Sequence, residues 1–527
     1  MRTTTRRAVL GAGIAAAGSG LLAACSKGTG DGPSSSSGAP AGFVSPDGRE
    51  VAAAEARRGT GPVRRVRLTA TPAQLDLGGG RTVASWAYGD ALPGREVRVT
   101  AGDTLALTLA NHLPVPTSVH WHGLALRNDM DGVPGLTQRP VAAGASHDYR
   151  FTVTRPGTYW LHPHSGTQQD RGLYAPLIVE DPKEPLSYDK EWVVVLDDWV
   201  DGVDGSTPDA VLAELAKGMD MGGMDHGGGH DMSHMSMTSV GRDAASSPSP
   251  TGPPRMLMGA TSDVLGGDAG DVAYPYYLVN GRTPENPETF TAKPGDRVRI
   301  RLINAGGDTA FRVALGDHRM TVTHTDGFPV EHIQTDTLLL GMGERYDVLV
   351  EVKDGVFPLT ALAEGKKRTA LALLRTGGGS APGADVRPRE LESAPLTADR
   401  LKAAGGVVLK ERRPDRTITL KLTGSMAKYD WAINGRTYSP SYRLPVAAGE
   451  RVRLAFVNAT TMWHPMHLHG HTFALPGGGA RKDTAIVLPG RRLEVDFDAD
   501  NPGLWMIHCH NVYHAESGMM TVLGYRA

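Results

Sequence analysis

The sequence has only two cysteines in 527 residues, Cys25 and Cys509, which excludes a disulfide framework. It also lacks an excess of charge of one sign: the formal net charge is −2, so nothing points to a nucleic acid or another polyanion as a partner. Aromatic residues make up only 6%, whereas the chain has 66 Gly and 36 Pro. That composition favours many short strands and turns over long helices. A chain of this length exceeds one ordinary core, and about two to four domains are expected.

The N-terminal segment lacks an uninterrupted apolar run. Arg6 and Arg7 precede a weakly apolar stretch of 17 residues (8–24), rich in Ala and Gly, which is the pattern of a twin-arginine export signal. Leu22-Ala-Ala-Cys25 resembles the end of a lipoprotein signal, in which Cys25 is lipidated and becomes the mature N-terminus. A membrane-spanning helix is the alternative, and it is disfavoured because the run is short and broken by Gly.

We therefore assign residues 1–25 to a twin-arginine lipoprotein signal. A lipid anchor at Cys25 predicts an exported protein at the outer face of the cytoplasmic membrane, in the periplasm or the cell envelope. Residues 26–62 follow, beginning with a stretch rich in Gly, Ser and Pro, and are assigned to a flexible tether.

One pattern occurs three times in the rest of the chain. A Gly and an acidic residue are followed by three apolar residues of period two and then by an Asn, nine positions after the Gly; the copies run from Gly102 to Asn111, from Gly295 to Asn304 and from Gly449 to Asn458. Each copy predicts a turn, a half-buried strand and a second turn. Three such strands imply three related all-β domains, at 63–185, 186–390 and 396–527, with linkers near 181–190 and 376–395.

Pairs of His one residue apart stand at matching offsets in the first and third domains. Eighteen and twenty residues after the Gly of each copy come two His, whereas the middle copy has Val313 and Leu315 there. A second pair in each end domain follows a matching Gly, at Gly157 and Gly503. The four pairs are His120 and His122, His162 and His164, His467 and His469, and His508 and His510. Eight imidazoles are too many for one ion, but they suit a cluster of three coppers if the first and third domains pack together.

The stretch around Cys509 predicts a second kind of metal site. Alternation along residues 504–510 reads as a strand, on which Cys509 faces one side while His508 and His510 face the other. Two His, one Cys and a distant Met are the ligands of a blue electron-transfer copper. The candidates are His464, Cys509, His514 and Met519, and the first domain has no counterpart of this set. A buried Cys among unrelated structural His is the alternative.

Taken in order, the motifs resemble those of the three-domain multicopper oxidases: laccases, ascorbate oxidase, bilirubin oxidase and the bacterial copper-resistance oxidases. The motifs are His120-Trp-His122-Gly, His162-Pro-His164-Ser, His464-Pro-Met-His467-Leu-His469-Gly, and His508-Cys509-His510 with His514 and Met519. The resemblance covers roughly residues 63–527. It implies three cupredoxin-like Greek-key β-sandwich or barrel domains and four copper ions.

The resemblance also implies a role for each ligand. It assigns His464, Cys509, His514 and Met519 to the type 1 copper, His120 and His467 to the type 2 copper, and His122, His162, His164, His469, His508 and His510 to the type 3 pair. The implied reaction takes electrons singly from a donor at the type 1 site. Cys509 then passes them through His508 and His510 to the cluster, where dioxygen is reduced to water.

Two further residues occupy family positions. Asp131 matches a carboxylate thought to help supply protons, although an Asp-Gly turn is the alternative. Met462 matches a Met that helps to bind substrate Cu(I) in cuprous oxidases, although Thr460 replaces the Asp that accompanies it, and packing is the alternative. Some members place an acid directly after the last type 1 His, but here that residue is Ala515, with Glu516 next.

A Met- and His-rich insertion, 219–237, lies in the middle domain. Thioether sulfur selects Cu(I), so the insertion predicts copper recruitment; its Gly content and lack of apolar periodicity favour disorder without metal. Its Met and His residues are Met219, Met221, Met224, His226, His230, Met232, His234, Met235 and Met237. A flexible low-complexity loop without a metal role is the alternative.

The expected function is oxidation of Cu(I) to Cu(II), with dioxygen as acceptor, by a monomer that serves copper tolerance. A laccase-like oxidase of phenols or aromatic amines and a ferroxidase are alternatives within the same enzyme class. A copper-sequestering protein outside the cytoplasm, working mainly through 219–237, is an alternative of another class. A copper nitrite reductase is disfavoured, because the complete eight-His set matches an oxygen-reducing cluster.

Overall fold

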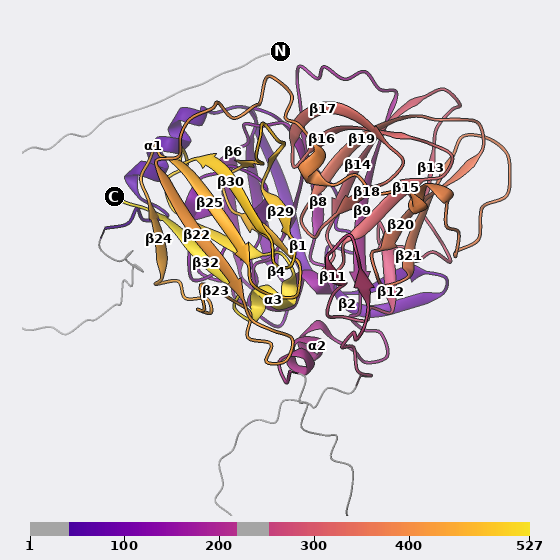
Figure 1. The fold of residues 1–527 in the computed structure, drawn as a ribbon, viewed down its shortest axis with the longest axis horizontal. Helices are drawn as coiled ribbons and strands as arrows, with labels where there is room; N and C mark the ends of the chain where they lie inside the picture. Colours follow the sequence, from indigo (N-terminus) through magenta and orange to yellow (C-terminus); the bar gives the residue numbers. More distant parts are fainter. Residues whose placement is uncertain (1–41, 219–251) are drawn as a thin grey trace, which may run out of the picture. The chain divides into compact units, whose positions relative to one another are not determined.

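The computed structural model describes residues 42–218 and 252–527, whose strands form three pairs of sheets in chain order (Figure 1). The predicted all-β class is confirmed. Among these residues no helix is long and apolar enough to cross a membrane. The predicted signal, Cys25 and the Met/His-rich insertion lie outside the described residues.

The first pair of sheets has the strand orders β2-β1-β4-β6 and β3-β8-β7-β5. Its elements are β1 (Val63–Gly78), β2 (Arg81–Tyr88), β3 (Val97–Thr100), β4 (Thr104–Asn111), β5 (His120–His122), the 3-10 helix η1 (Asn128–Met130), β6 (Ser146–Thr152), β7 (Gly157–His162), the 3-10 helix η2 (Gly166–Arg171) and β8 (Ala175–Glu180). Strands β5 and β7 are antiparallel, with His120 opposite His162. This register puts the two His pairs of the domain at one end of one sheet.

The middle pair of sheets has the orders β12-β9-β14-β19-β16-β17 and β13-β21-β20-β15-β18, with a separate hairpin of β10 and β11. Its elements are β9 (Lys190–Trp199), α2 (Pro208–Leu215), β10 (Thr261–Ser262), β11 (Gly267–Asp268), β12 (Tyr276–Val279), β13 (Thr289–Thr291), β14 (Arg297–Asn304), β15 (Phe311–Leu315), β16 (Met320–Thr325), β17 (Phe328–Thr335), β18 (Leu338–Leu340), β19 (Arg345–Glu351), β20 (Val356–Ala363), β21 (Arg368–Arg375), and the 3-10 helices η4 (Arg389–Glu392) and η5 (Ala398–Arg400). Val313 and Leu315, on β15, are fully buried in its core.

The third pair of sheets has the orders β23-β22-β25-β30-β27-β28 and β24-β32-β31-β26-β29. Its elements are β22 (Arg416–Thr423), β23 (Ala432–Ile433), β24 (Arg443–Val446), β25 (Arg451–Asn458), β26 (His464–Leu468), β27 (Phe473–Ala474), β28 (Arg481–Lys482), β29 (Thr484–Val487), β30 (Arg492–Asp498), β31 (Leu504–Cys509), α3 (Val512–Glu516) and β32 (Met520–Tyr525). Antiparallel pairing of β26 with β31 sets His467 opposite His508 and Met466 opposite Cys509. The two His-bearing segments of this domain are therefore neighbours, as in the first domain.

The repeated Gly-to-Asn pattern forms the equivalent strands β4, β14 and β25, each preceded by a Gly with positive φ. The Asn that ends each strand makes the same contacts in all three domains, because its amide group donates to two backbone carbonyls beyond the strand. The acceptors are Val115 and Val141 for Asn111, Thr309 and Leu340 for Asn304, and Met462 and Val487 for Asn458. The Asn thus fixes the loop that leads to the next strand of the opposite sheet.

Part of the predicted tether is folded, so that prediction is wrong for its C-terminal part. Helix α1 (Arg49–Arg58) lies within 26–62, and its Val51 and Ala54 are buried. Its sequence is rich in Ala, Glu and Arg, which are good helix formers, and the two buried residues are three apart on one face. The side chain of Glu55 accepts from the Thr152 N–H at 2.7 Å, and Arg58 donates to Asn501 at 2.9 Å. The helix is therefore tied to the first and third domains.

Candidate copper centres

The structure brings the eight predicted cluster histidines together where β5 and β7 of the first domain meet β26 and β31 of the third. The rings of His120 and His469 stack at 3.8 Å between centroids, and those of His122 and His467 at the same distance. Each stack joins one end domain to the other. Seven of the eight side chains are buried, and His164 is half-buried.

Within the cluster the ring nitrogens converge in groups. Nε2 of His508 is 3.1 Å from Nε2 of His469 and 3.5 Å from Nε2 of His164. Nε2 of His510 is 3.2 Å from Nδ1 of His122. His164, His469 and His508 can place one ligand atom each within 4.8 Å of one another, and so can His120, His122 and His162, and His120, His467 and His469. Such spacing suits several metal ions rather than one.

Backbone carbonyls orient three of these rings by accepting a hydrogen bond from the Nδ1 atom. Nδ1–H of His162 donates to the Pro163 carbonyl at 3.0 Å, that of His467 to the Asp483 carbonyl at 2.9 Å, and that of His508 to the Cys509 carbonyl at 2.8 Å. A ring that donates from one nitrogen keeps the other free for a metal. The tautomer of each of these imidazoles is therefore set by its surroundings.

Several inward nitrogens have no other partner. Nε2 of His120, His162 and His467 is buried and has no hydrogen-bond partner among the described residues. A buried polar atom left unpaired costs about 1–3 kcal/mol, so these nitrogens need a ligand. Burial lowers the pKa of His162 and His508 well below the ordinary value, which favours the neutral form that binds metal. The donor set and its protonation therefore fit a copper cluster.

The four predicted type 1 ligands form a second group, near the C-terminal end of β31. Nδ1 of His464 and Nδ1 of His514 are 3.1 Å apart, and each is 3.6 Å from Sγ of Cys509. His464 begins β26, Cys509 ends β31 and His514 lies on α3. The Met519 side chain is fully buried, and its carbonyl accepts from the Cys509 N–H at 3.0 Å. Two imidazole nitrogens and one thiol thus point at one spot, as a type 1 copper requires.

Asp131 contacts two of the predicted ligands and also forms the turn that was its alternative role. Its Oδ2 is 2.9 Å from Nδ1 of His469, and its Oδ1 is 3.2 Å from Nδ1 of His120. The next residue, Gly132, has φ of +80°, and a Cβ there would lie 1.7 Å from the Val119 carbonyl oxygen. The carboxylate is therefore held against the cluster by a turn that only Gly allows.

Sequence reasoning missed Asp271 and Tyr429, which hold one of the predicted type 1 histidines, and it did not foresee the bond from Thr460 to the other. Nε2 of His514 lies 2.9 Å from Oδ2 of Asp271, and the Tyr429 hydroxyl donates to the same oxygen at 2.6 Å. Nε2 of His464 is 2.8 Å from the hydroxyl of Thr460, which stands where cuprous oxidases of the family have an Asp. Asp271 belongs to the middle domain and follows a hairpin without any motif, so no local signal marked it.

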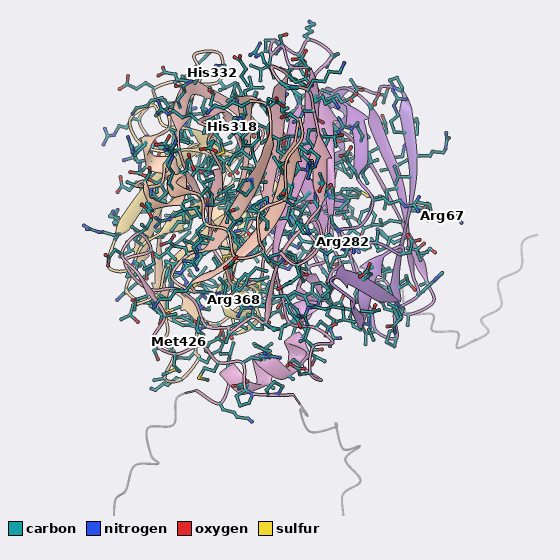
Figure 2. All side chains as sticks on the ribbon, turned by 90° about the vertical axis from the view of Figure 1, so that its right-hand side faces the viewer. Arg67, Arg282, His318, His332, Arg368 and Met426 are labelled. Carbon is teal, nitrogen blue, oxygen red and sulfur yellow. The ribbon has the colours of Figure 1, made fainter. Side chains whose placement is uncertain are left out.

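Among the residues predicted to bind substrate, only Met462 lies in the described part of the chain. The Met462 side chain is 1% exposed and packs in the hydrophobic core, which is the alternative role left open by the sequence. All nine Met and His of the insertion 219–237 lie outside the described residues. Two His of the middle domain, labelled in Figure 2, belong to neither centre: His318 is buried and bonded to Gly316 and Lys353, and His332 is exposed.

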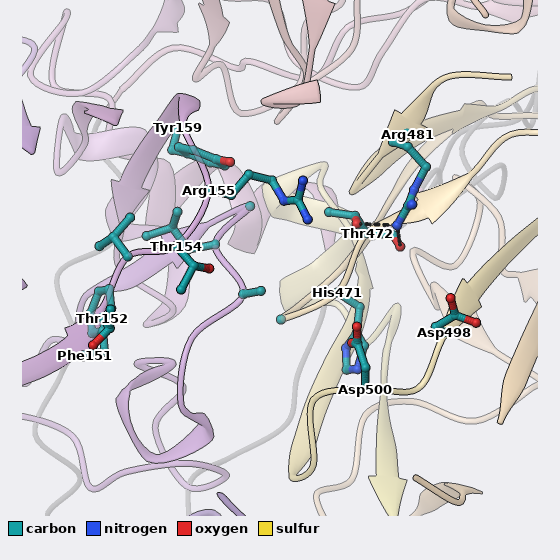
Figure 3. A pocket seen from close by; sticks show the side chains of 15 residues that line it. Phe151, Thr152, Thr154, Arg155, Tyr159, His471, Thr472, Arg481, Asp498 and Asp500 are labelled. Atoms are coloured by element: carbon teal, nitrogen blue, oxygen red, sulfur yellow. Dashed lines mark hydrogen bonds between the residues drawn. The ribbon is translucent and has the colours of Figure 1, made fainter. Parts of the chain in front are cut away.

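Two cavities adjoin the cluster. One of about 30 Å³ is lined by His162, His164, His508 and His510 together with Glu516, whose pKa burial raises to about 7. The other, of about 190 Å³, begins at Gly123 and Gly470, which directly follow two of the His pairs. Figure 3 shows Arg155 and Arg481 reaching into it from the first and third domains. Water-sized space thus exists against four of the cluster histidines and beside the residues that follow two of the His pairs.

Comparison with known proteins agrees with this geometry. The multicopper oxidase family matches residues 69–184, 253–379 and 411–526. The chain is 47% identical to multicopper oxidase MmcO of Mycobacterium tuberculosis, over 99% of this chain and 97% of that protein. It is 30% identical to a copper resistance protein A homolog of Pseudomonas syringae, over 86% and 90% of the two chains.

A solved structure shares the fold. The crystal structure of a multi-copper oxidase from Pseudomonas thermotolerans superimposes with a TM-score of 0.64 at 26% identity, covering 88% of this chain and 99% of that one. The resemblance to the family and the cupredoxin-like fold inferred from the sequence are therefore confirmed. The chain belongs to the multicopper oxidases, enzymes that carry four copper ions and use dioxygen as electron acceptor.

Proposed function

We propose that this enzyme is a cuprous oxidase, which oxidises Cu(I) to Cu(II) outside the cytoplasm and so serves copper tolerance. Four Cu(I) ions supply four electrons, which with four protons convert one dioxygen to two waters. The observation that carries the proposal is the position of Gly218, the residue before the Met/His-rich insertion. A Cβ at Gly218 would lie 2.1 Å from the carbonyl oxygen of Ala427, so the two backbones touch.

A short series of contacts connects Ala427 with the predicted type 1 site. Ala427 lies two residues before Tyr429, whose hydroxyl donates to Asp271, and Asp271 contacts His514. Met219, the first thioether of the insertion, directly follows Gly218 in the chain. Gly218, the last described residue before the insertion, therefore lies near the groups that contact the proposed type 1 ligand His514, where a carrier of Cu(I) would be useful.

Burial of the type 1 histidines also favours a small donor. His464 and His514 are fully buried; Thr460 contacts His464, Asp271 contacts His514, and the Trp431 ring packs against both imidazoles. A bulky phenol could not touch either imidazole without displacing these groups. A metal ion handed over by thioethers needs no such opening.

For the ligands we propose the assignment that the sequence resemblance implies. The type 1 copper would be held by His464, Cys509, His514 and Met519, the type 2 copper by His120 and His467, and the type 3 pair by His122, His162, His164, His469, His508 and His510. When bound, the type 1 copper accepts single electrons, and the other three reduce dioxygen. Cys509 is bonded through the backbone to His508 and His510, so one strand links the two centres. Asp131 keeps two of the imidazoles in place and is the nearest candidate for supplying protons.

We also propose that the protein is an exported, lipid-anchored monomer. The support is the twin-arginine pattern at Arg6 and Arg7 and the lipoprotein-like sequence that ends at Cys25. Cys25→Ser should move the protein from the membrane fraction to the soluble fraction of the envelope. An unchanged membrane fraction would contradict the anchor.

The test of the cuprous oxidase compares electron donors. Oxygen uptake by copper-loaded protein is measured with chelated Cu(I) and with a simple phenol, for the intact chain and for a chain lacking 219–237. A variant of full length, with the six Met of the insertion changed to Ser, is the matched control for loop length. We expect Cu(I) to be the faster donor for the intact chain only, and both variants to lose that advantage while retaining phenol oxidation.

Other outcomes point elsewhere. Preference for the phenol by the intact chain would favour a laccase-like oxidase, in keeping with the 28% identity to Laccase-2 of Botryotinia fuckeliana. Several weakly bound coppers beyond four, lost on deletion without any change in turnover, would favour a copper-sequestering role. Either result would refute the delivery of Cu(I) by the insertion.

A further inference from the structure

We propose that the middle domain, which supplies none of the predicted ligands, closes the three-copper cluster through residues 341–345, with Arg345 as a positioning residue. The inference rests on the ligand assignment proposed above. Two independent observations support it: the packing of Gly343 against two ligand rings, and the contacts of the Arg345 guanidinium. Gly343 precedes β19 and Arg345 begins it, and β19 pairs with β14, the strand that ends at the repeated Asn304.

Gly343 lies directly against the cluster. A Cβ at this position would be 2.9 Å from Cε1 of His122 and 2.9 Å from Cδ2 of His510, and Gly343 has φ of +82°. His122 comes from the first domain and His510 from the third. The middle domain therefore covers a point where the two end domains meet, and only a residue without a side chain fits there.

Arg345 reaches the same point through a carboxylate. Its Nη1 and Nη2 donate to the two oxygens of Asp483, each at 2.7 Å, in a bidentate pair that is completely buried. Its Nε donates to the Thr158 carbonyl of the first domain at 3.1 Å, and its Nη1 also donates to the Gly343 carbonyl at 3.0 Å. One guanidinium thus contacts all three domains.

Asp483 in turn holds two predicted ligands, one from each end domain. Its Oδ1 accepts from Nε2–H of His122 at 3.1 Å, and its carbonyl accepts from Nδ1–H of His467 at 2.9 Å. Asp326 of the middle domain accepts from the backbone N–H of Asp483 at 3.2 Å and from that of Arg345 at 2.9 Å. Both the side chain and the backbone of Asp483 are therefore fixed by the middle domain.

The physical consequence is that Arg345 acts on the cluster through Asp483 without touching a ligand. Without the guanidinium, Asp483 would be a buried carboxylate lacking its bidentate partner, free to rotate away from His122. Partners behind metal ligands set ring orientation, and their loss typically lowers metal affinity or activity about 10- to 100-fold. None of these contacts of Arg345 and Asp483 involves a proposed ligand of the type 1 copper.

The test uses the full chain loaded with copper and compares Arg345→Met with Arg299→Met. Arg299 is an equally buried arginine of the middle domain that pairs with Asp347 and touches no predicted ligand, so it controls for the loss of a buried ion pair. Copper per chain, the blue absorption, the electron paramagnetic resonance spectrum of the type 2 copper and the rate of oxygen uptake are measured for both.

We expect Arg345→Met to keep the blue absorption, to lose cluster copper or change the type 2 resonance, and to turn over about 10- to 100-fold more slowly. Arg299→Met should keep all four properties. Arg345→Lys retains the charge without the planar fork, so it should restore part of the turnover. If Arg345→Met does not fold, Arg345→Lys carries the test, and a type 2 resonance equal to that of the wild type would overturn the proposal.

Wild-type copper content, resonance and turnover in Arg345→Met would overturn the positioning role, as would equal losses in Arg299→Met. The proposed ligand assignment is tested separately in the same experiment by the unmodified chain. If the unmodified chain binds no type 2 or type 3 copper, the assignment itself fails. An intact cluster in the unmodified chain together with an unaffected Arg345→Met refutes the positioning role alone.

Discussion

Asn458 fixes the loop that leads into the predicted type 1 site, and its removal should both destabilise the protein and change that site. Its amide group donates to the carbonyls of Met462 at 2.7 Å and Val487 at 3.0 Å, and its Oδ1 accepts from the Thr460 N–H at 2.9 Å. Asn458→Ala removes these three bonds, and a fourth from the Thr460 hydroxyl, at a buried position. At about 1 kcal/mol for each bond, and more where a group stays unsatisfied, the free energy of unfolding should fall by about 3–6 kcal/mol.

Asn304 provides the matched control, because it makes the same three bonds in the middle domain, to Thr309, Leu340 and Gly306. Asn304→Ala should cost a similar free energy but leave the blue absorption of copper-loaded protein unchanged. Asn458→Ala should shift that absorption, because the Thr460 hydroxyl bridges Asn458 and Nε2 of His464, at 2.8 Å from each.

The two free energies are measured by urea unfolding of the copper-free chain, followed by tryptophan fluorescence, so that metal binding does not contribute to stability. The spectra are recorded after copper loading. A loss below about 1 kcal/mol for both variants would refute the reasoning about the Asn contacts. An equal spectral change in both would refute the link from Asn458 to the type 1 site.

Three further changes have definite outcomes. Cys509→Ser should abolish the blue absorption and oxygen uptake, because a hydroxyl does not replace the thiolate ligand; a variant that is still blue would remove Cys509 from the site. Asp131→Asn should retain the blue absorption but slow oxygen uptake about 10- to 100-fold, and unchanged uptake would leave Asp131 as a turn residue only. Burial raises the pKa of Asp201 to about 6, so the native state keeps a proton that the unfolded chain releases near pH 4. Stability should therefore decline by about 2–3 kcal/mol as pH rises from about 4 to about 6, and Asp201→Asn should flatten that decline in urea unfolding across pH; parallel pH profiles would contradict it.

Much of the fold could be predicted because its signals are local. The Gly, the alternating apolar residues and the closing Asn of each repeat predicted β4, β14 and β25, and these three strands end at the expected Asn. The pairing of the histidines could also be anticipated, because equal offsets in two repeats place residues at equal positions of a sheet. Helix α1 was missed because the tether predicted from the Gly- and Ser-rich stretch was continued to residue 62. That range includes a short segment of good helix formers.

Arg345, Asp483 and Asp271 could not be predicted as neighbours of the ligands, because the contacts that place them join distant parts of the chain. Arg345 and Asp483 are 138 positions apart, and Asp271 and His514 are 243 positions apart. Neither carboxylate lies in a motif, and a single Asp or Arg has no periodicity. Contacts of this kind depend on how three domains pack, and that packing is decided by surfaces spread over the whole chain.

The middle domain shows that the pair of sheets can form without histidines at the repeated positions. Its β14 and Asn304 repeat the contacts of the end domains, yet β15 carries buried Val313 and Leu315 at the offsets where the end domains have histidines. The sheet pair therefore forms without imidazoles, and apolar side chains fill those positions without leaving a polar atom unpaired. In the end domains the same positions hold rings, of which His120 and His467 have buried nitrogens without a partner. Such atoms reduce stability, so their presence in register in both end domains fits the metal ions that these histidines are proposed to hold.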